Sequence, residues 1–184
     1  MVTTTTATGC FKCSKKCDLW KNYLKEDKIF YSTRKSVIAL FRQHLDCKSK
    51  DVIYLATWKQ CKVQCVGSTS NEFKVRFRNH KSATLANKTT CEFNLVRRVS
   101  LPPTLLGTGR RGPWEQGWCE LAVHFNRVEH MMSDFEFIVI EKVVNESEDH
   151  IDRRLLTRKA FCCSQLCTLH PQGLNERSEF NSKK

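Results

Sequence analysis

Long apolar runs, prolines and glycines are all scarce in this 184-residue sequence, which has four prolines and seven glycines. No stretch approaches the roughly 18 consecutive apolar residues of a membrane-spanning helix. Residues 1–9 are rich in threonine and lack the apolar core of a secretory signal peptide. We therefore expect an intracellular protein, nuclear or cytoplasmic, that is neither secreted nor attached to a membrane.

Acidic side chains are also scarce, with 19 Asp and Glu against 31 Lys and Arg and a formal net charge of +12. The excess is uneven, because residues 101–150 are acidic on balance and the rest of the chain is basic. A polarised basic surface is typical of proteins that meet a polyanion. The charge therefore favours a nucleic-acid partner, and the alternative is a solvated basic face without one.

Cysteine, by contrast, is abundant, with 11 residues. In a reducing compartment many cysteines indicate metal binding or chance more than disulfides. The length suits one domain, or one domain with a small appendage.

Composition divides the chain into a disordered start (1–9), a Cys-rich basic lead-in (10–50), a main domain (51–177) and a tail (178–184). Residues 92–118 hold three of the four prolines and four of the seven glycines, without a helical or strand period. A segment of this length without structure is unusual inside a compact domain. We interpret it as an insertion that loops out, or as sequence that is not a genuine part of the protein.

The main domain has three predicted strands. Residues 51–58 are β-branched and aromatic, and residues 62–67 follow so closely that an antiparallel hairpin is expected. Residues 135–143 form the third strand. The fold class is therefore α/β: a small, mainly antiparallel three-stranded sheet flanked by helices.

Two helices are predicted around these strands. The first begins after residues 68–72, with Phe73 and Phe77 four apart on one face and Arg76 and His80 four apart on an adjoining face. The second runs from residue 147 to about residue 166 and is closed by a proline and a glycine, at positions 171 and 173.

Three of these segments together resemble the GIY-YIG nuclease family. Residues 52–54 (Val-Ile-Tyr) match its first motif, with valine in place of glycine. Residues 65–67 (Cys-Val-Gly) match its second motif, with cysteine in place of tyrosine. Residues 76–80 supply its Arg-x-x-x-His helix.

The endonuclease domain of Penelope-like retroelements is the most similar subgroup. The likeness rests on residues 121–126 followed by His130, on the predicted strand 135–141, and on the ending 166–176. The Cys-rich basic lead-in also fits, whereas residues 92–118 have no counterpart. The resemblance implies a DNA endonuclease of retroelement origin that acts on the phosphate backbone of double-stranded DNA.

The resemblance also implies roles for four residues. Tyr54 would activate the water and Arg76 would neutralise the phosphate, because a guanidinium binds two phosphate oxygens and stays charged. His80 would position substrate or relay a proton. Asn175 matches the asparagine of the C-terminal motif. One divalent metal, Mg²⁺ or Mn²⁺, would act as Lewis acid.

Two departures from the family pattern weaken this site. Lys159 stands where the family has its metal-binding glutamate, and an ammonium repels a divalent cation. Cys65 removes the phenol of the second motif. Glu141 is one conceivable substitute ligand, and Glu148 is a weaker one.

A zinc site is also implied by the family, from a Cys-x-x-Cys between the signature strands and two downstream histidines. Here Cys61, His124 and His130 are in place, whereas Trp58 stands at the first cysteine position. Structural zinc requires four ligands, and Cys65 is the candidate for the fourth. The alternative is a vestigial cluster without metal.

The lead-in repeats this pattern with Cys10, Cys13 and Cys17, followed by Trp20 where the family would have a fourth cysteine. Cys47 or another ligand would be needed to complete that site.

Three functions remain open at this point. The chain is a GIY-YIG-type endonuclease domain impaired in catalysis, a catalytically dead nucleic-acid-binding module, or a decayed mobile-element remnant.

Overall fold

The computed structural model describes residues 7–14, 17–35, 38–82, 124, 130–144 and 150–176. Its elements are β1 (Gly9–Cys10), α1 (Asp18–Asn22), β2 (Ile29–Tyr31), β3 (Ile38–Leu40), β4 (His44–Leu45), β5 (Val52–Trp58), β6 (Gln64–Thr69), the 3-10 helix η2 (Met132–Asp134), β7 (Phe135–Lys142) and α4 (Ile151–Leu166). Residues 73–82 are also helical and are called the 73–82 helix. The predicted insertion and tail lie outside the described residues. Within the described ranges, no helix has the length and apolar character to cross a membrane.

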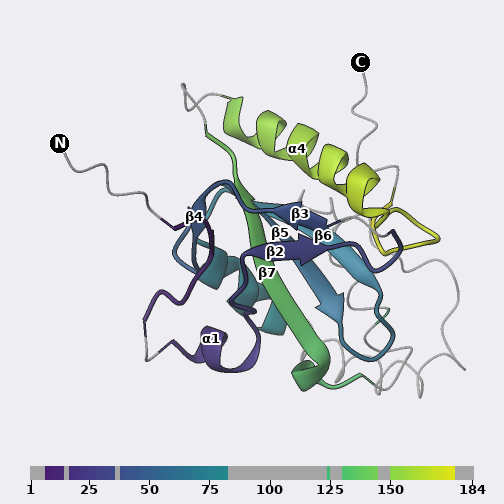
Figure 1. Ribbon diagram of the computed structural model, residues 1–184, viewed down its shortest axis with the longest axis horizontal. Coiled ribbons are helices and arrows are strands. Elements are labelled where there is room, and N and C mark those ends of the chain that lie inside the picture. Colours follow the sequence, from purple (N-terminus) through teal and green to yellow (C-terminus); the bar gives the residue numbers. More distant parts are fainter. Residues whose placement is uncertain are drawn as a thin grey trace, which may run out of the picture.

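The fold is mixed α/β and centres on a three-stranded antiparallel sheet in the order β6-β5-β7 (Figure 1). The predicted hairpin and third strand are confirmed, with ends within two residues of those expected. Tyr54 on β5 lies opposite Gly67 on β6 and Val139 on β7. A β-bulge interrupts the β5–β7 pairing between Ile53 and Tyr54.

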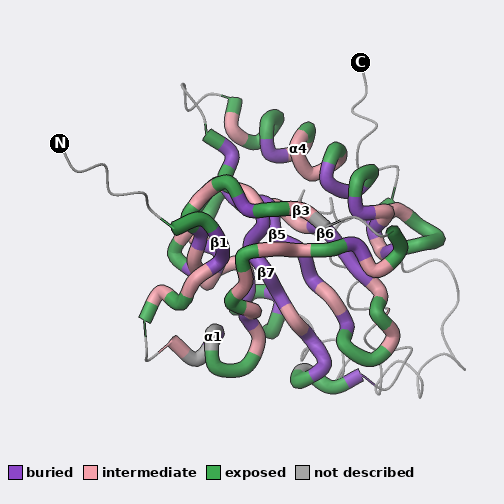
Figure 2. Tube along the Cα trace, in the orientation of Figure 1, coloured by how far each residue is buried: buried purple, intermediate pink, exposed green. Residues whose placement is uncertain are grey.

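Both faces of the central strand are covered, which explains why β5 is buried almost throughout (Figure 2). Neighbouring residues of a strand point to opposite faces. On one face, Phe73 of the 73–82 helix packs against Tyr54, with 5.0 Å between ring centroids. On the other face, Leu55 shares a small hollow with Ile29 and Tyr31 of β2. An alternating strand pattern is therefore absent from the sequence, as expected for a strand without a solvated face.

The lead-in belongs to the same core as the main domain. Phe137 N on β7 donates a hydrogen bond to Tyr23 O at 2.7 Å, and Phe137 O accepts one from Lys25 N at 2.9 Å. Leu24 and Leu45 are buried in the continuous core cluster. Two small sheets, β1–β4 and β2–β3, complete this region. The segment predicted to be disordered already contributes Gly9 to β1; residues 1–6 lie outside the described part.

Helix α4 ends where the backbone turns left-handed. Its apolar stripe buries Leu155, Cys162, Cys163 and Leu166 against the sheet. Cys167 has φ 54° and ψ 42° and caps the helix, with its N–H bonded to helix carbonyls. The predicted end at residue 166 is confirmed, but Cys167 ends the helix and the proline and glycine lie in the turn beyond it. The predicted first turn, residues 147–149, lies outside the described residues.

Candidate active site and metal-ligating clusters

The phenol of Tyr54 lies directly over Gly67 of the neighbouring strand. A Cβ atom placed on Gly67 would overlap the Tyr54 Cζ and Oη atoms. The φ of this glycine is not positive, so space and not backbone conformation demands glycine here. The glycine of the second predicted motif therefore makes room for the tyrosine of the first.

The 73–82 helix brings two further predicted residues to this phenol. Its first turn is anchored by backbone hydrogen bonds from Phe73 N to Ser49 O (3.0 Å) and from Lys74 N to Cys47 O (2.8 Å). Phe73 and Phe77 face the core, as the four-residue spacing predicted. The adjoining face then directs Arg76 and His80 at Tyr54.

Three predicted residues meet in one hydrogen-bonded group. The Tyr54 hydroxyl lies 2.5 Å from His80 Nε2, and Arg76 Nε donates to the same hydroxyl at 3.3 Å. Because the hydroxyl accepts from Arg76, we assign its proton to the bond with His80 Nε2. Tyr54 and His80 are only 2% and 4% exposed. The arrangement is therefore a preorganised, largely desolvated group.

Burial sets the protonation states of this group. Desolvation, with the positive charge of Arg76 as a second cause, lowers the pKa of His80 well below 6.5. Desolvation raises the pKa of Tyr54 above 10, although Arg76 opposes it. At neutral pH the imidazole and the phenol are both uncharged, and the guanidinium carries the positive charge.

Lys159 and Cys65 both influence the pKa of the same tyrosine. Lys159 is half-buried on the sheet-facing stripe of α4, one turn from Leu155. Its positive charge lowers the pKa of Tyr54, whereas Cys65 raises it. The charges at both degenerate positions thus act on the phenol that the resemblance makes catalytic.

Glu141, the predicted substitute ligand, is engaged elsewhere. Arg158 binds both its carboxylate oxygens, at 2.8 and 2.7 Å. Glu148, the other candidate, lies outside the described residues. Among the described residues, no group of three metal-ligating side chains lies at Tyr54.

Asn175 fastens the turn after α4 to the sheet. Its side-chain oxygen accepts from Val66 N and its amide nitrogen donates to Val66 O, each at 2.8 Å. Both groups are buried. The side chain therefore positions β6, which carries Cys65 and Gly67.

The first metal-ligating cluster is the predicted set Cys61, His124 and His130. Cys61 Sγ lies 3.4 Å from His124 Nε2 and 3.6 Å from His130 Nε2, and the two nitrogens are 3.2 Å apart. In a tetrahedral zinc site two imidazole nitrogens lie about 3.3 Å apart, and a nitrogen and a thiolate sulfur about 3.6 Å. Burial and the neighbouring His130 lower the pKa of His124, which favours the neutral ligand form.

Trp58, which stands where the family has a further cysteine ligand, packs against the two histidines of the cluster. Its ring is fully buried and meets His124 edge to face, with 5.1 Å between centroids. Cys65, the predicted fourth ligand, does not belong to the cluster: it lies on β6, beside Tyr54. The prediction was wrong because Cys65 pairs with Ala56 along the strand, away from the β5–β6 turn that carries Cys61.

The second cluster contains Cys13, Cys17 and Cys47. Cys13 and Cys47 form a disulfide, and Cys17 Sγ lies 3.6 Å from Cys47 Sγ. The predicted candidate Cys47 thus joins Cys13 and Cys17, although composition predicted metal binding over disulfides and the two bonded cysteines are 34 positions apart. Cys10, a predicted ligand, lies outside the cluster; it is buried on β1, and burial raises its pKa to about 12.

Comparison of the chain with protein-family models, with curated proteins and with solved structures found no match.

Proposed function

We propose that this chain is a DNA-binding domain of GIY-YIG endonuclease type, in which Tyr54, His80 and Arg76 form a phosphate site and cleavage is impaired. The convergence of Arg76 and His80 on the Tyr54 hydroxyl carries the proposal. Residues from a strand and a helix meet in a buried hydrogen-bonded group, in the order that the resemblance requires. A tyrosine in an apolar core needs only one hydrogen-bond partner, so a purely structural role leaves the arginine unexplained.

The group can move a proton and hold an anion. A neutral imidazole accepts a proton, so His80 Nε2 would take the phenol proton while the phenol oxygen takes one from water. The guanidinium of Arg76 would stabilise the charge that develops on the phosphate. Glycine at position 67 leaves the space beside β6 that the phenol occupies.

The residues around this group do not fit the divalent cation that the resemblance implies. Lys159 places an ammonium where a carboxylate is needed, and Arg158 already occupies both oxygens of Glu141. Hard divalent cations require oxygen ligands. We therefore expect the chain to bind DNA even when a chelator removes divalent cations, and to cleave it slowly.

Plasmid nicking in Mg²⁺ or Mn²⁺ tests the proposal with three chains: the unaltered one, Lys159→Glu, and Lys159→Glu/Cys65→Tyr. We expect the double variant to nick roughly a hundredfold faster than the unaltered chain, because a charge-stabilising group is restored. Adding Arg76→Ala should abolish the gain, and Arg78→Ala on the exposed face of the same helix is the matched control.

Two results would contradict the proposal. Robust nicking by the unaltered chain, lost in Arg76→Ala, would show that catalysis is not impaired. A doubly reverted chain that neither binds nor cuts DNA would remove the nuclease assignment. Binding itself is measured against salt, since each neutralised phosphate contributes a log–log slope near −0.9.

A catalytically dead binding module is the second candidate, and Lys159 favours it. The charge of this half-buried ammonium acts on Tyr54 and adds to the positive charge of Arg76, which would strengthen phosphate binding and oppose a metal. This candidate predicts that the double variant binds DNA and still fails to cut it.

We also propose zinc at Cys61, His124 and His130, whose atom spacings fit tetrahedral ligands. Zinc there would fasten the β5–β6 turn, which carries Cys61, to His130 just before η2. Elemental analysis of the unaltered chain and of Cys61→Ser tests this, with less zinc expected in the variant.

A further inference from the structure

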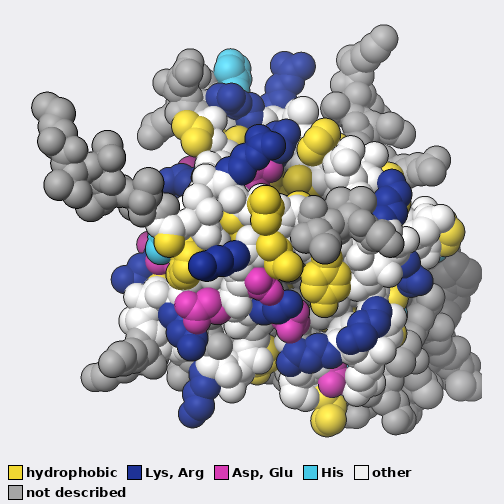
Figure 3. Space-filling model, viewed as in Figure 1, with side chains coloured by type: hydrophobic (Ala, Val, Ile, Leu, Met, Phe, Trp, Pro, Cys, Tyr) yellow, Lys and Arg dark blue, Asp and Glu magenta, His cyan; other side chains and the backbone are white. Residues whose placement is uncertain are grey.

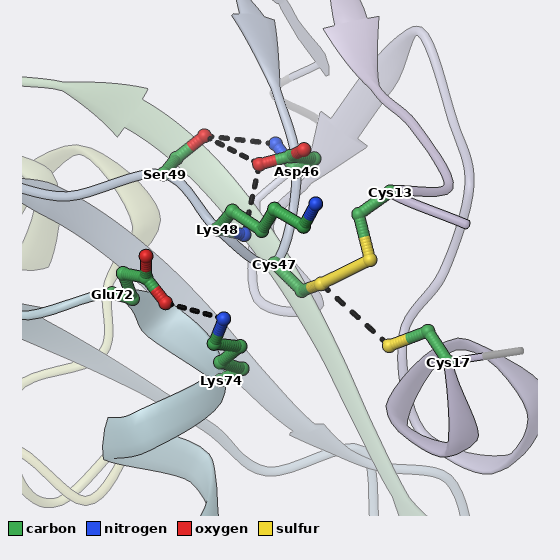
Figure 4. The surroundings of a disulfide bond; sticks show 8 residues. All are labelled: Cys13, Cys17, Asp46, Cys47, Lys48, Ser49, Glu72 and Lys74. Atoms are coloured by element: carbon green, nitrogen blue, oxygen red, sulfur yellow. Dashed lines mark hydrogen bonds and ion pairs between the residues drawn. A yellow bond between two sulfur atoms is a disulfide. The ribbon is translucent and has the colours of Figure 1, made fainter.

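Three cysteine sulfurs from distant parts of the lead-in meet within 4.8 Å of one another (Figure 4). Cys13 precedes α1, Cys17 caps its start, and Cys47 follows β4. Cys47 is fully buried, whereas Cys13 and Cys17 are half-buried. No other group of three ligating side chains occurs in the described residues, apart from the Cys61 cluster.

This arrangement supports two mutually exclusive states. The first is the disulfide between Cys13 and Cys47, with the Cys17 thiol beside it. The second is a metal site, because thiolates around a tetrahedral zinc ion lie about 3.8 Å apart, close to the 3.6 Å between Cys17 and Cys47. The Cα atoms of Cys13 and Cys47 are 6.1 Å apart, so once the disulfide is reduced, side-chain rotation without backbone movement can separate the two sulfurs.

We propose that Cys13, Cys17 and Cys47 form a redox-controlled zinc site, which holds Zn²⁺ through three thiolates when reduced and releases it when Cys13 and Cys47 form their disulfide. Soft thiolate ligands select zinc over the hard cations. Solvent supplies the fourth ligand, since Cys13 and Cys17 are partly exposed. The inference stands apart from the proposed nuclease-type site.

The exchange balances with a small-molecule disulfide as oxidant. The Cys13 and Cys47 thiolates lose two electrons and form one S–S bond, while the S–S bond of the oxidant breaks to give two thiolates. Zinc leaves as Zn²⁺, and the Cys17 thiolate takes up a proton from water.

The position of Cys47 gives this exchange a structural consequence. Its carbonyl oxygen accepts the hydrogen bond from Lys74 N in the first turn of the 73–82 helix. The neighbouring turn is held by Asp46, whose carboxylate accepts from Lys48 N at 2.9 Å and from the Ser49 hydroxyl at 3.0 Å (Figure 4). Either cross-link therefore fixes the lead-in to the turn that anchors this helix.

The test uses the full chain carrying Cys61→Ser, which removes the other cluster. After reduction and loading with ZnCl₂, native mass spectrometry counts bound zinc; oxidised glutathione is then added, and peptide mapping follows the disulfide. We expect one zinc ion per chain that is lost on oxidation as the Cys13–Cys47 linkage appears.

Two further variants identify the ligands. Adding Cys17→Ser should abolish zinc binding and still allow the disulfide, which also shows that the variant folds. Adding Cys167→Ser, at a half-buried cysteine outside both clusters, is the matched control and should keep the zinc. Failure of the reduced chain to bind zinc would overturn the proposal. Equal zinc in the Cys17→Ser chain, or zinc retained after the disulfide forms, would also overturn it.

Discussion

At the residue scale, the candidate site depends on a few short contacts with little tolerance. Tyr54 has space for its phenol only because position 67 is glycine, and its hydroxyl is shared by His80 and Arg76. The motifs in the sequence predict these residues. They could not show that Lys159 acts on the same phenol, because that depends on how α4 crosses the sheet.

His80 should make the protein sensitive to mild acid. Its pKa is lowered well below 6.5 in the folded state, so the unfolded chain binds more protons as the pH falls below about 6.5. The free energy of unfolding should therefore fall from pH 6.5 to pH 5, by up to about 1.4 kcal/mol per pH unit for this group. Urea unfolding across this range measures the slope.

In His80→Gln the free energy of unfolding should depend less on pH between pH 6.5 and pH 5, because glutamine keeps a polar group but does not titrate. His150→Gln, at an exposed histidine before α4, is the matched control. The attribution to His80 fails if its variant shows the same slope as the unaltered chain.

At the scale of elements, one side chain holds the C-terminal turn to the sheet. The Asn175 amide accepts a hydrogen bond from Val66 N and donates one to Val66 O, and Leu174 N donates to Gln64 O at 3.1 Å. The turn thus occupies the open edge of β6 and satisfies backbone groups that an edge strand otherwise exposes.

Asn175→Ala should lower the free energy of unfolding by about 2–3 kcal/mol, because two buried backbone groups lose their partners. Amide hydrogen exchange at Val66 should accelerate as well. Gln172→Ala, an exposed residue of the same turn, serves as the control. Unchanged protection of Val66 would show that water or another group replaces the asparagine.

At the scale of the whole molecule, the basic lead-in and the sheet form one structure. Residues 23–25 extend the sheet beyond β7 through Phe137, and Cys10, Leu24 and Leu45 lie in the common core. The space-filling view shows Lys and Arg spread over much of one face, with a smaller acidic group among them (Figure 3). The positive charge is thus carried by a region that folds with the site.

Removing residues 1–35 should therefore abolish cooperative unfolding of the remainder. The truncated chain would expose the core residues that the lead-in covers and leave the backbone of Phe137 without its partners. Thermal unfolding followed by circular dichroism, with a chain lacking only residues 1–6 as the control, measures this. A truncated chain that still melts in one sharp transition would show that the main domain folds alone.

The sequence by itself determined the three strands of the central sheet, the approximate end of α4, and the pairs Phe73/Phe77 and Arg76/His80. These depend on local periodicity and composition, which act within a few residues. The sequence also named Cys47 as a candidate to join Cys13 and Cys17. The tertiary structure alone decided that Cys10 lies outside that cluster, that Cys65 lies on the face of Tyr54 and outside the zinc cluster, and that Arg158 binds Glu141. Such pairings join residues far apart in the chain, and only the packing of the whole core fixes which of them meet.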